Sequence, residues 1–299
     1  MDAQQTRQGI FFALGAYFIW GIAPAYFKLI QQVDAGEIMT HRVIWSFFFM
    51  LILVSVTRNW SRIKLTLQQP KKVLLLAVSA TLVCCNWLIF IWAVNNNHIL
   101  EASLGYFINP LLNVLVGMVF LGERFRRLQW LAVLLAACGV LVQLWKFGSV
   151  PVIALGLAVT FSFYGLLRKK IGVDAQTGML IETSWLLPVA AIYLFGIADS
   201  STSHLTQNPI SLNLLLVAAG IVTTIPLMLF TAACTRLRLS TVGFFQYLGP
   251  TLMFLLAVVF YGEQLTPDKA VTFSFIWAAL ALFIFDALWT MRRREVRLS

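Results

Sequence analysis

The chain has 299 residues, of which 60% are hydrophobic, 14% aromatic and only 11% charged. Soluble globular domains carry about 25% charged residues, so this composition excludes a water-soluble protein and indicates a chain that folds in lipid. The net charge of +10 does not indicate nucleic-acid binding, because basic residues at membrane boundaries account for the same excess.

Apolar runs long enough to cross a bilayer follow one another along the whole chain. Ten membrane helices are predicted, at residues 8–30, 36–57, 72–93, 100–121, 128–146, 150–167, 177–197, 212–234, 240–261 and 268–290. The first run is longer than a signal-peptide core, so we expect it in the mature protein. The connections are too short for an independent soluble domain.

The distribution of basic residues predicts the orientation of the helices. Of the 22 lysines and arginines, 18 fall in the termini and the even-numbered connections, whereas only Lys28, Lys146 and Lys269 fall in the others. By the positive-inside rule, both termini are cytoplasmic, and we expect a multi-pass protein of the bacterial inner membrane. The four cysteines lie inside apolar runs without Cys-x-x-Cys or Cys/His spacing, so no disulfide framework, metal site or cofactor is predicted.

An internal repeat divides the chain into two halves. Pro110, Gly122 and Glu123 recur 140 residues later as Pro250, Gly262 and Glu263. Residues 8–146 and 150–290 are therefore predicted to be two repeats of five helices each. An odd number of crossings makes the second repeat enter from the opposite face, and such inverted repeats are typical of alternating-access carriers.

Several segments make the chain resemble a known family. They include GIFFALGAYFIWGIAPAYFK at 9–28, HRVIWS at 41–46, NWLIFIWAVNNNHILEASLGYFINPL at 86–111 and QYLGPTLMFLLAVVFYGE at 246–263. In these segments the chain resembles the RarD-like branch of the drug/metabolite transporter superfamily, whose members carry two EamA-type repeats. The resemblance covers nearly the whole chain and implies an inner-membrane permease that exports small metabolites or drugs. The branch carries a chloramphenicol-resistance label.

Polar residues along the fourth and ninth predicted helices form the first candidate substrate site. On the fourth helix the polar and small groups recur at steps of three and four, at Ser103, Tyr106, Asn109, Asn113 and Gly117. The repeat relates Tyr106 to Gln246, which is followed by Tyr247. We expect these stripes to line a central cavity; the alternative is hydrogen bonding between helices. Pro110 and Pro250 are expected to kink their helices.

Aromatic and amide side chains of the first and third predicted helices extend this candidate site. Tyr17, Trp20 and Pro24 share one face of the first helix, and Asn86 and Trp87 lie on the third. An aromatic box with a few amides suits an uncharged or zwitterionic solute of aromatic size. The alternative for the tryptophans near helix ends is the interfacial belt.

Charged residues inside predicted helices are candidates for gating or coupling. Glu182 is a candidate for proton coupling, because a buried carboxyl group can exchange protons near neutral pH, or else a gate or packing partner. His41 and Arg42 lie in the outer half of the second helix, where Arg42 either holds an anionic substrate group, gates the outer mouth or extends to the outer interface. Asp286 is expected to meet water near the inner end of the tenth helix. Glu123 and Glu263 are expected to be boundary or gate residues.

The sequence therefore predicts a secondary exporter of small organic solutes such as chloramphenicol-like drugs, amino acids or related metabolites, with protons as a candidate coupling ion and membrane lipids as its surroundings. No nucleotide-binding motif is present, which excludes primary active transport by this chain. A receptor or partner subunit without flux is the alternative. An intramembrane enzyme is disfavoured, because no ligand set or nucleophile motif is found.

Overall fold

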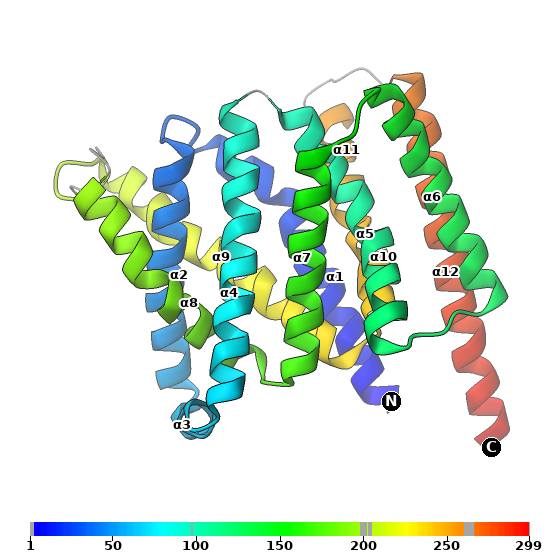
Figure 1. Ribbon diagram of the computed structural model, residues 1–299, viewed down its shortest axis with the longest axis horizontal. Coiled ribbons are helices and arrows are strands. Elements are labelled where there is room, and N and C mark those ends of the chain that lie inside the picture. Colours follow the sequence, from blue (N-terminus) through cyan, green and yellow to red (C-terminus); the bar gives the residue numbers. More distant parts are fainter. Residues whose placement is uncertain (1–2, 97, 198–201, 203–204, 260–265, 299) are drawn as a thin grey trace.

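The computed structural model describes residues 3–96, 98–197, 202, 205–259 and 266–298, and the described secondary structure is helical. The elements are α1 (Ala3–Lys28), α2 (Ala35–Val56), α3 (Trp60–Leu67), α4 (Pro70–Asn95), α5 (Ile99–Leu121), α6 (Arg127–Phe147), α7 (Val152–Ile171), α8 (Ala175–Ile192), the π-helix η1 (Tyr193–Ile197), α9 (Ile210–Arg236), α10 (Leu239–Gln246), α11 (Leu248–Val259) and α12 (Pro267–Leu298). Both chain ends lie at the same, lower end of the bundle in Figure 1.

Ten of the described segments are long and apolar enough to cross a membrane, which confirms the predicted all-helical fold. Two details differ from the hydropathy pattern. The connection predicted at 58–71 contains the short amphipathic helix α3, and the ninth span is interrupted at Tyr247, between α10 and α11. Pro250 lies in the first turn of α11, where its missing N–H costs least.

The two halves of the chain pack against each other by equivalent contacts. The first helix of the second half, α7, packs on α4 and α5, the third and fourth spans of the first half. In the same way α1 packs on α9 and α11, the corresponding spans of the second half. In Figure 1, α1 rises from the end that holds both termini, whereas α7 descends toward it. This exchange of contacts places the interior of the bundle between the two repeats.

The fifth and tenth spans, α6 and α12, form a pair at one side of the bundle (Figure 1). An ion pair joins them at each end: Arg126 to Asp286 at 2.5 Å, and Lys146 to Asp268 at 2.5 Å. Gly139 of α6 lets the backbones approach, since a Cβ there would lie 3.1 Å from the Thr272 carbonyl oxygen. The pair forms a rigid flank beside the interior helices.

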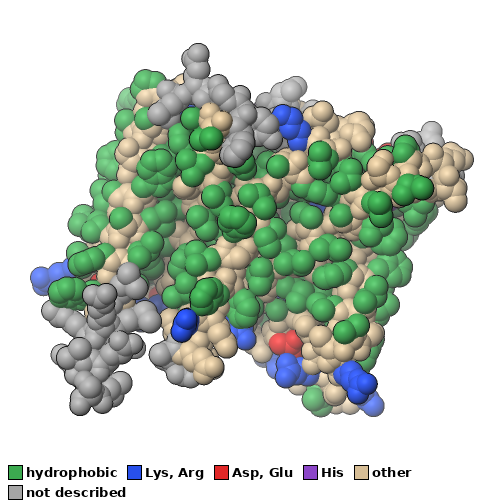
Figure 2. Space-filling view, turned by 180° about the vertical axis from the view of Figure 1, so that it is seen from behind, with side chains coloured by type: hydrophobic (Ala, Val, Ile, Leu, Met, Phe, Trp, Pro, Cys, Tyr) green, Lys and Arg blue, Asp and Glu red, His purple; other side chains and the backbone are tan. Residues whose placement is uncertain are grey.

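The surface carries the pattern expected of a membrane protein. Figure 2 shows apolar side chains over the middle of the visible face, with most of the visible lysine and arginine side chains toward its lower end. Large side chains such as Phe11, Val119 and Trp145 are more exposed than buried, as lipid-facing residues are.

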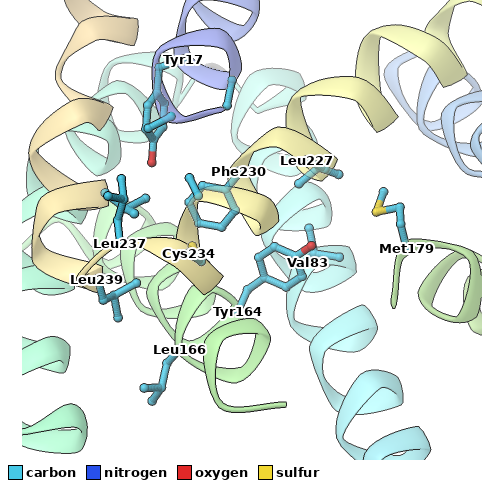
Figure 3. Packing of buried hydrophobic residues seen from close by; sticks show 14 of the residues in the cluster. Tyr17, Val83, Tyr164, Leu166, Met179, Leu227, Phe230, Cys234, Leu237 and Leu239 are labelled. Carbon is cyan, nitrogen blue, oxygen red and sulfur yellow. The ribbon is translucent and has the colours of Figure 1, made fainter. Parts of the chain in front are cut away.

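The largest buried cluster fills the half of the bundle nearest the termini. It brings together Tyr17 from α1, Tyr164 from α7, Phe230 and Cys234 from α9 and Leu239 from α10 (Figure 3). The ring of Phe230 lies 6.0 Å from that of Tyr164 and 6.3 Å from that of Tyr17. Aromatic packing of this kind closes the interior at this end.

Candidate transport site

The amides of the fourth and ninth spans meet and join helices, instead of facing an open cavity in this structure. Asn113 Nδ2 donates to Asn109 Oδ1 at 2.9 Å and to Gln246 Oε1 at 3.1 Å, and Asn109 Nδ2 donates to the Ala158 carbonyl at 3.3 Å. Asn109, Asn113 and Gln246 are all buried. This arrangement resembles the interhelical alternative, although the buried Asn113 Oδ1 accepts no hydrogen bond from the described residues.

Two further candidates also make contacts between helices. Asn86 Nδ2 donates to the Leu157 carbonyl at 2.8 Å and to Thr160 Oγ1 at 2.9 Å, which fixes α4 against α7. The Tyr247 hydroxyl donates to the Phe107 carbonyl at 3.2 Å from a fully buried ring. Both side chains thus join helices, although the bonds of half-buried Asn86 use only its Nδ2.

The aromatic candidates of α1 face the interior. Trp20 lies 5.8 Å from Phe161 and 5.9 Å from Phe230, between ring centroids, and Tyr17 lies 5.5 Å from Trp20. The Tyr17 hydroxyl is buried without a hydrogen-bond partner. Pro24 lies inside α1 and Pro110 inside α5.

Arg42 of α2 lies in a cage of aromatic side chains. Its guanidinium carbon is 4.7 Å from the centroid of the Trp87 ring on α4 and 5.4 Å from that of Phe27 on α1. Its Nε donates to Thr223 Oγ1 on α9 at 2.7 Å. Because these partners come from three other helices, the side chain points into the bundle and does not extend to the interface.

Two further candidates lie near Arg42 in the sequence or the fold: Tyr106 is close to its side chain, whereas His41 makes a separate contact. Tyr106 is 37% exposed, packs edge-on against Phe90 and is close enough to interact electrostatically with Arg42. His41 points elsewhere: its Nε2 lies 2.9 Å from Thr202 Oγ1, which donates to Glu37 at 2.7 Å. His41 thus contacts Thr202 and is not part of the cage around Arg42.

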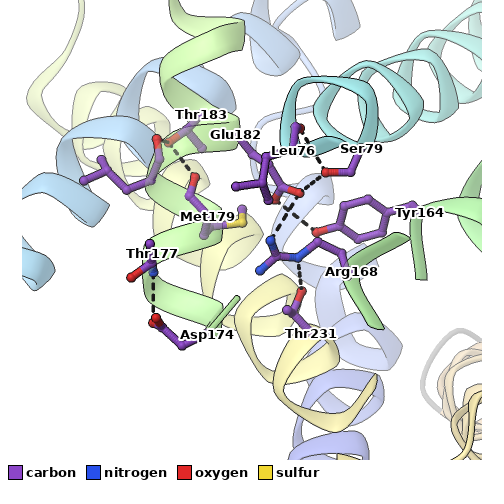
Figure 4. A network of polar contacts seen from close by, with 11 residues as sticks. Leu76, Ser79, Tyr164, Arg168, Asp174, Thr177, Met179, Glu182, Thr183 and Thr231 are labelled. Carbon is purple, nitrogen blue, oxygen red and sulfur yellow. Dashed lines mark hydrogen bonds and ion pairs between the residues drawn. The ribbon is translucent and has the colours of Figure 1, made fainter. Parts of the chain in front are cut away.

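Glu182 lies at the centre of a buried polar network near the other end (Figure 4). One carboxylate oxygen accepts from Ser79 of α4 and lies 3.6 Å from Arg168 Nη1; the other accepts from the Tyr164 hydroxyl at 3.4 Å. Arg168 Nε donates to Thr231 Oγ1 at 3.3 Å, whereas neither Nη atom of Arg168 has a hydrogen-bond partner. The network joins α4, α7, α8 and α9.

A small cavity lies beside Glu182 and reaches Trp87, one of the aromatic side chains around Arg42. It has a volume of about 10 Å³, room for about one water molecule, and lies among α2, α4, α7, α8 and α9. Its lining is almost entirely apolar surface, although Ser46, Trp87, Tyr164, Glu182 and Thr183 are among the residues that form it. Trp87 therefore contacts the Arg42 cage on one side and the Glu182 cavity on the other.

Arg168 is the functional candidate that sequence reasoning missed. By sequence it belongs to a run of three basic residues, Arg168 to Lys170, that is typical of a membrane boundary, yet its side chain is fully buried. A signal lay in Gly178, because a Cβ at that position would lie 1.9 Å from Arg168 Nη1. The glycine leaves the space that the guanidinium occupies, but only the fold shows which side chain fills it.

Two acidic residues at helix ends bind groups of other segments: Glu123 caps a helix, and Asp286 forms an ion pair. Glu123 accepts from the backbone N–H groups of Leu239 and Ser240, at 2.6 and 3.1 Å, and so caps α10. Glu263 lies outside the described residues. The expectation that Asp286 meets water is wrong, because it is 4% exposed and paired with Arg126.

Comparison with known proteins agrees with this architecture. The EamA-like transporter family matches the chain twice, at residues 7–145 and 149–285, and the chain belongs to this family. It is a membrane transporter and not an enzyme. The described residues contain no group of three or more potential metal ligands.

Proteins named RarD are among the relatives that the chain resembles over nearly its whole length. "Protein RarD" of Escherichia coli is 74% identical over 98% of this chain and 99% of its own length. "Chloramphenicol-sensitive protein RarD" of Pseudomonas aeruginosa is 33% identical over 98% of both chains. A crystal structure at 19% identity has a TM-score of 0.70 over 94% of this chain and 98% of its own, and shares the fold. The resemblance to the RarD-like branch is confirmed.

Proposed function

We propose that this transporter is a secondary exporter of small organic solutes, among them chloramphenicol-like drugs, amino acids and related metabolites. The observation that carries the proposal is the Arg42 cage, a charged and partly accessible centre inside a bundle of apolar helices. A charged group at such a depth is costly and is retained where it contacts a solute or an ion. The chloramphenicol-sensitive name of the Pseudomonas relative supports a drug as one substrate.

Alternating access between the two repeats is the mechanism we propose. In the half of the bundle nearest the termini, the side chains of Tyr17, Tyr164, Arg168 and Phe230 are buried. The Arg42 half retains partly exposed side chains, Tyr106 among them. The conformation is thus closed toward the end that carries the termini, and the repeats provide an equivalent way to close the other end.

Glu182 is the proposed gate and coupling residue on the closed side. Its carboxylate joins α4, α7 and α8, and its ion pair with Arg168 exists only while the carboxyl group stays charged. Uptake of a proton would remove its attraction for Arg168, whose Nη atoms have no other partner to retain them. His41 and Arg42 are the proposed gating residues of the opposite half.

The orientation completes the proposal. We infer that the repeats span about residues 8–146 and 150–290 in the bacterial inner membrane, with lipid around them and both termini in the cytoplasm. The basic side chains at one end of the visible face support this orientation (Figure 2). In that orientation the closed half faces the cytoplasm.

The test is solute flux in proteoliposomes made with the wild-type protein and with Glu182→Gln. Chloramphenicol and a panel of aromatic and aliphatic amino acids are each measured with and without an imposed pH gradient. We expect flux that follows the gradient in the wild type and loses this dependence in Glu182→Gln, which keeps the shape but not the charge. Flux that ignores the gradient would contradict proton coupling, and no flux across the panel would contradict the proposed substrates.

A further inference from the structure

The cage around Arg42 has the composition of a binding site for an anion. Trp87 and Phe27 stack against the guanidinium, and Thr223 accepts from Nε. Aromatic faces and one hydroxyl orient a cation, but they do not neutralise it. None of the ion pairs among the described residues includes Arg42.

The N–H groups of Arg42 that form no hydrogen bond with the described part of the protein are those that can bind a carboxylate. A guanidinium has five N–H groups, and the contact with Thr223 uses the one on Nε. The Nη groups form no hydrogen bond with any described residue, and, unlike those of Arg168, they are not sealed from solvent. Two parallel N–H groups of this kind bind a carboxylate through both of its oxygens.

The residues around Arg42 also indicate the shape and charge of the rest of the ligand. Trp87 extends from the cage to the cavity shared with Val43 and Leu186, and Tyr106 with Phe90 forms a second aromatic wall. Such walls bind an apolar or aromatic body by burial of its surface. Arg42 is the one cation of the cage among the described residues, and a single cation matches a single negative charge better than a dianion.

We propose that Arg42 binds the carboxylate of a small organic solute whose apolar or aromatic body lies along Trp87. The proposal rests on the transport function proposed above and narrows its substrates to singly charged organic anions and zwitterions. Neutral solutes would use the aromatic walls alone and bind more weakly.

A matched pair of ligands tests this directly. N-acetylphenylalanine and its amide differ in the carboxylate alone, and their dissociation constants are measured by titration calorimetry on the purified full-length protein in detergent. We expect the acid to bind about tenfold or more tightly than the amide, the usual effect of a charge-assisted bidentate contact. Arg42→Gln should bring the two within about twofold, and Arg62→Gln, an exposed arginine on α3, should leave the preference intact.

Each other result overturns a stated part of the account. Equal binding of acid and amide by the wild type, which needs no variant, overturns the carboxylate proposal, as does a preference that persists in folded, monodisperse Arg42→Gln. Tighter binding of phenyl phosphate than of the acid replaces the carboxylate by a phosphate group. Flux of both ligands without preference overturns this inference and leaves the exporter standing; absence of binding and flux for every probe, chloramphenicol included, overturns the proposed function itself.

Discussion

Single buried residues of this transporter depend on partners from distant parts of the sequence. Arg168 and Glu182 are both buried, and each is compensated chiefly by the other, with support from Ser79, Tyr164 and Thr231. A buried ion pair is weak evidence of stability, because desolvation offsets the attraction, but removal of one partner leaves an uncompensated charge. The pair is thus suited to a gate whose strength depends on one proton.

Removal of Glu182 alone should therefore lower the free energy of unfolding more than removal of both Glu182 and Arg168. We expect Glu182→Leu to lower the free energy of unfolding by about 3–5 kcal/mol, because Arg168 stays buried and unpaired. The double variant Glu182→Leu with Arg168→Met should regain most of this loss. Thermal and denaturant unfolding in a mild detergent measures both; a single variant as stable as the wild type would contradict the account of the network.

The candidate site was only partly predictable at this scale. The repeat placed polar groups on equivalent faces of the fourth and ninth spans, and in the structure Asn113 bonds to both Asn109 and Gln246. Sequence could not tell whether these amides face a cavity or another helix, because both arrangements need the same spacing. Arg168 was missed because three basic residues at a helix end are also the usual sign of a membrane boundary.

At the level of helices, close approach of backbones holds α2 and α9 together. A Cβ on Gly220 would lie 2.4 Å from the Trp45 carbonyl carbon, and Ser46 Oγ donates to the Gly220 carbonyl at 3.2 Å. Arg42 and Thr223 lie one turn beyond this contact on the same two helices. Small residues at such crossings let membrane helices pack where hydrophobic burial contributes little.

Gly220→Ala is expected to separate the two helices, because the clash is with backbone that cannot rotate away. The loss should be about 1–3 kcal/mol, typical of overpacking, and binding at the Arg42 cage should weaken as well. Gly196→Ala in η1, where the added Cβ meets nothing within 4 Å, serves as the control in the same unfolding assay. Equal stability of the two variants would show that the α2–α9 crossing tolerates a wider gap.

Hydropathy predicted the ten spans because lipid allows few other solutions, whereas finer features follow from tertiary contacts. The break at Tyr247 lies in a run whose mean hydropathy still predicts one span, although Gln246, Gly249 and Pro250 flank the break. The helix α10 begins where Glu123, more than a hundred residues earlier, accepts from its first N–H groups. Its position depends on a side chain that local patterns do not connect with it.

The whole molecule is a two-repeat bundle in which each repeat packs its first helix into the other. Because the ten spans are fixed relative to one another, the orientation of one helix in the membrane gives the orientation of all ten. Residues Arg127 and Val150 flank α6 at opposite ends and are both exposed. They therefore offer the most direct check of the proposed topology.

Cysteines placed at these two positions should react from opposite sides of the membrane. In a variant whose four native cysteines are replaced, we expect Val150→Cys to react with an impermeant maleimide added to intact cells, and Arg127→Cys to react only after the membrane is opened. The two sites use the same reagent and the same background, so each controls for the other. The reverse pattern would invert the orientation and place the closed half outside.

The central claim is that solute crosses by alternate exposure of one interior site, and counterflow measures this most directly. Proteoliposomes loaded with an unlabelled amino acid that the protein transports are diluted into a trace of the labelled form, without any ion gradient. The account predicts transient accumulation of label above equilibrium, because each return of the loaded carrier brings label inward. Label that only equilibrates, at a rate independent of the internal solute, would indicate a pore and contradict the claim.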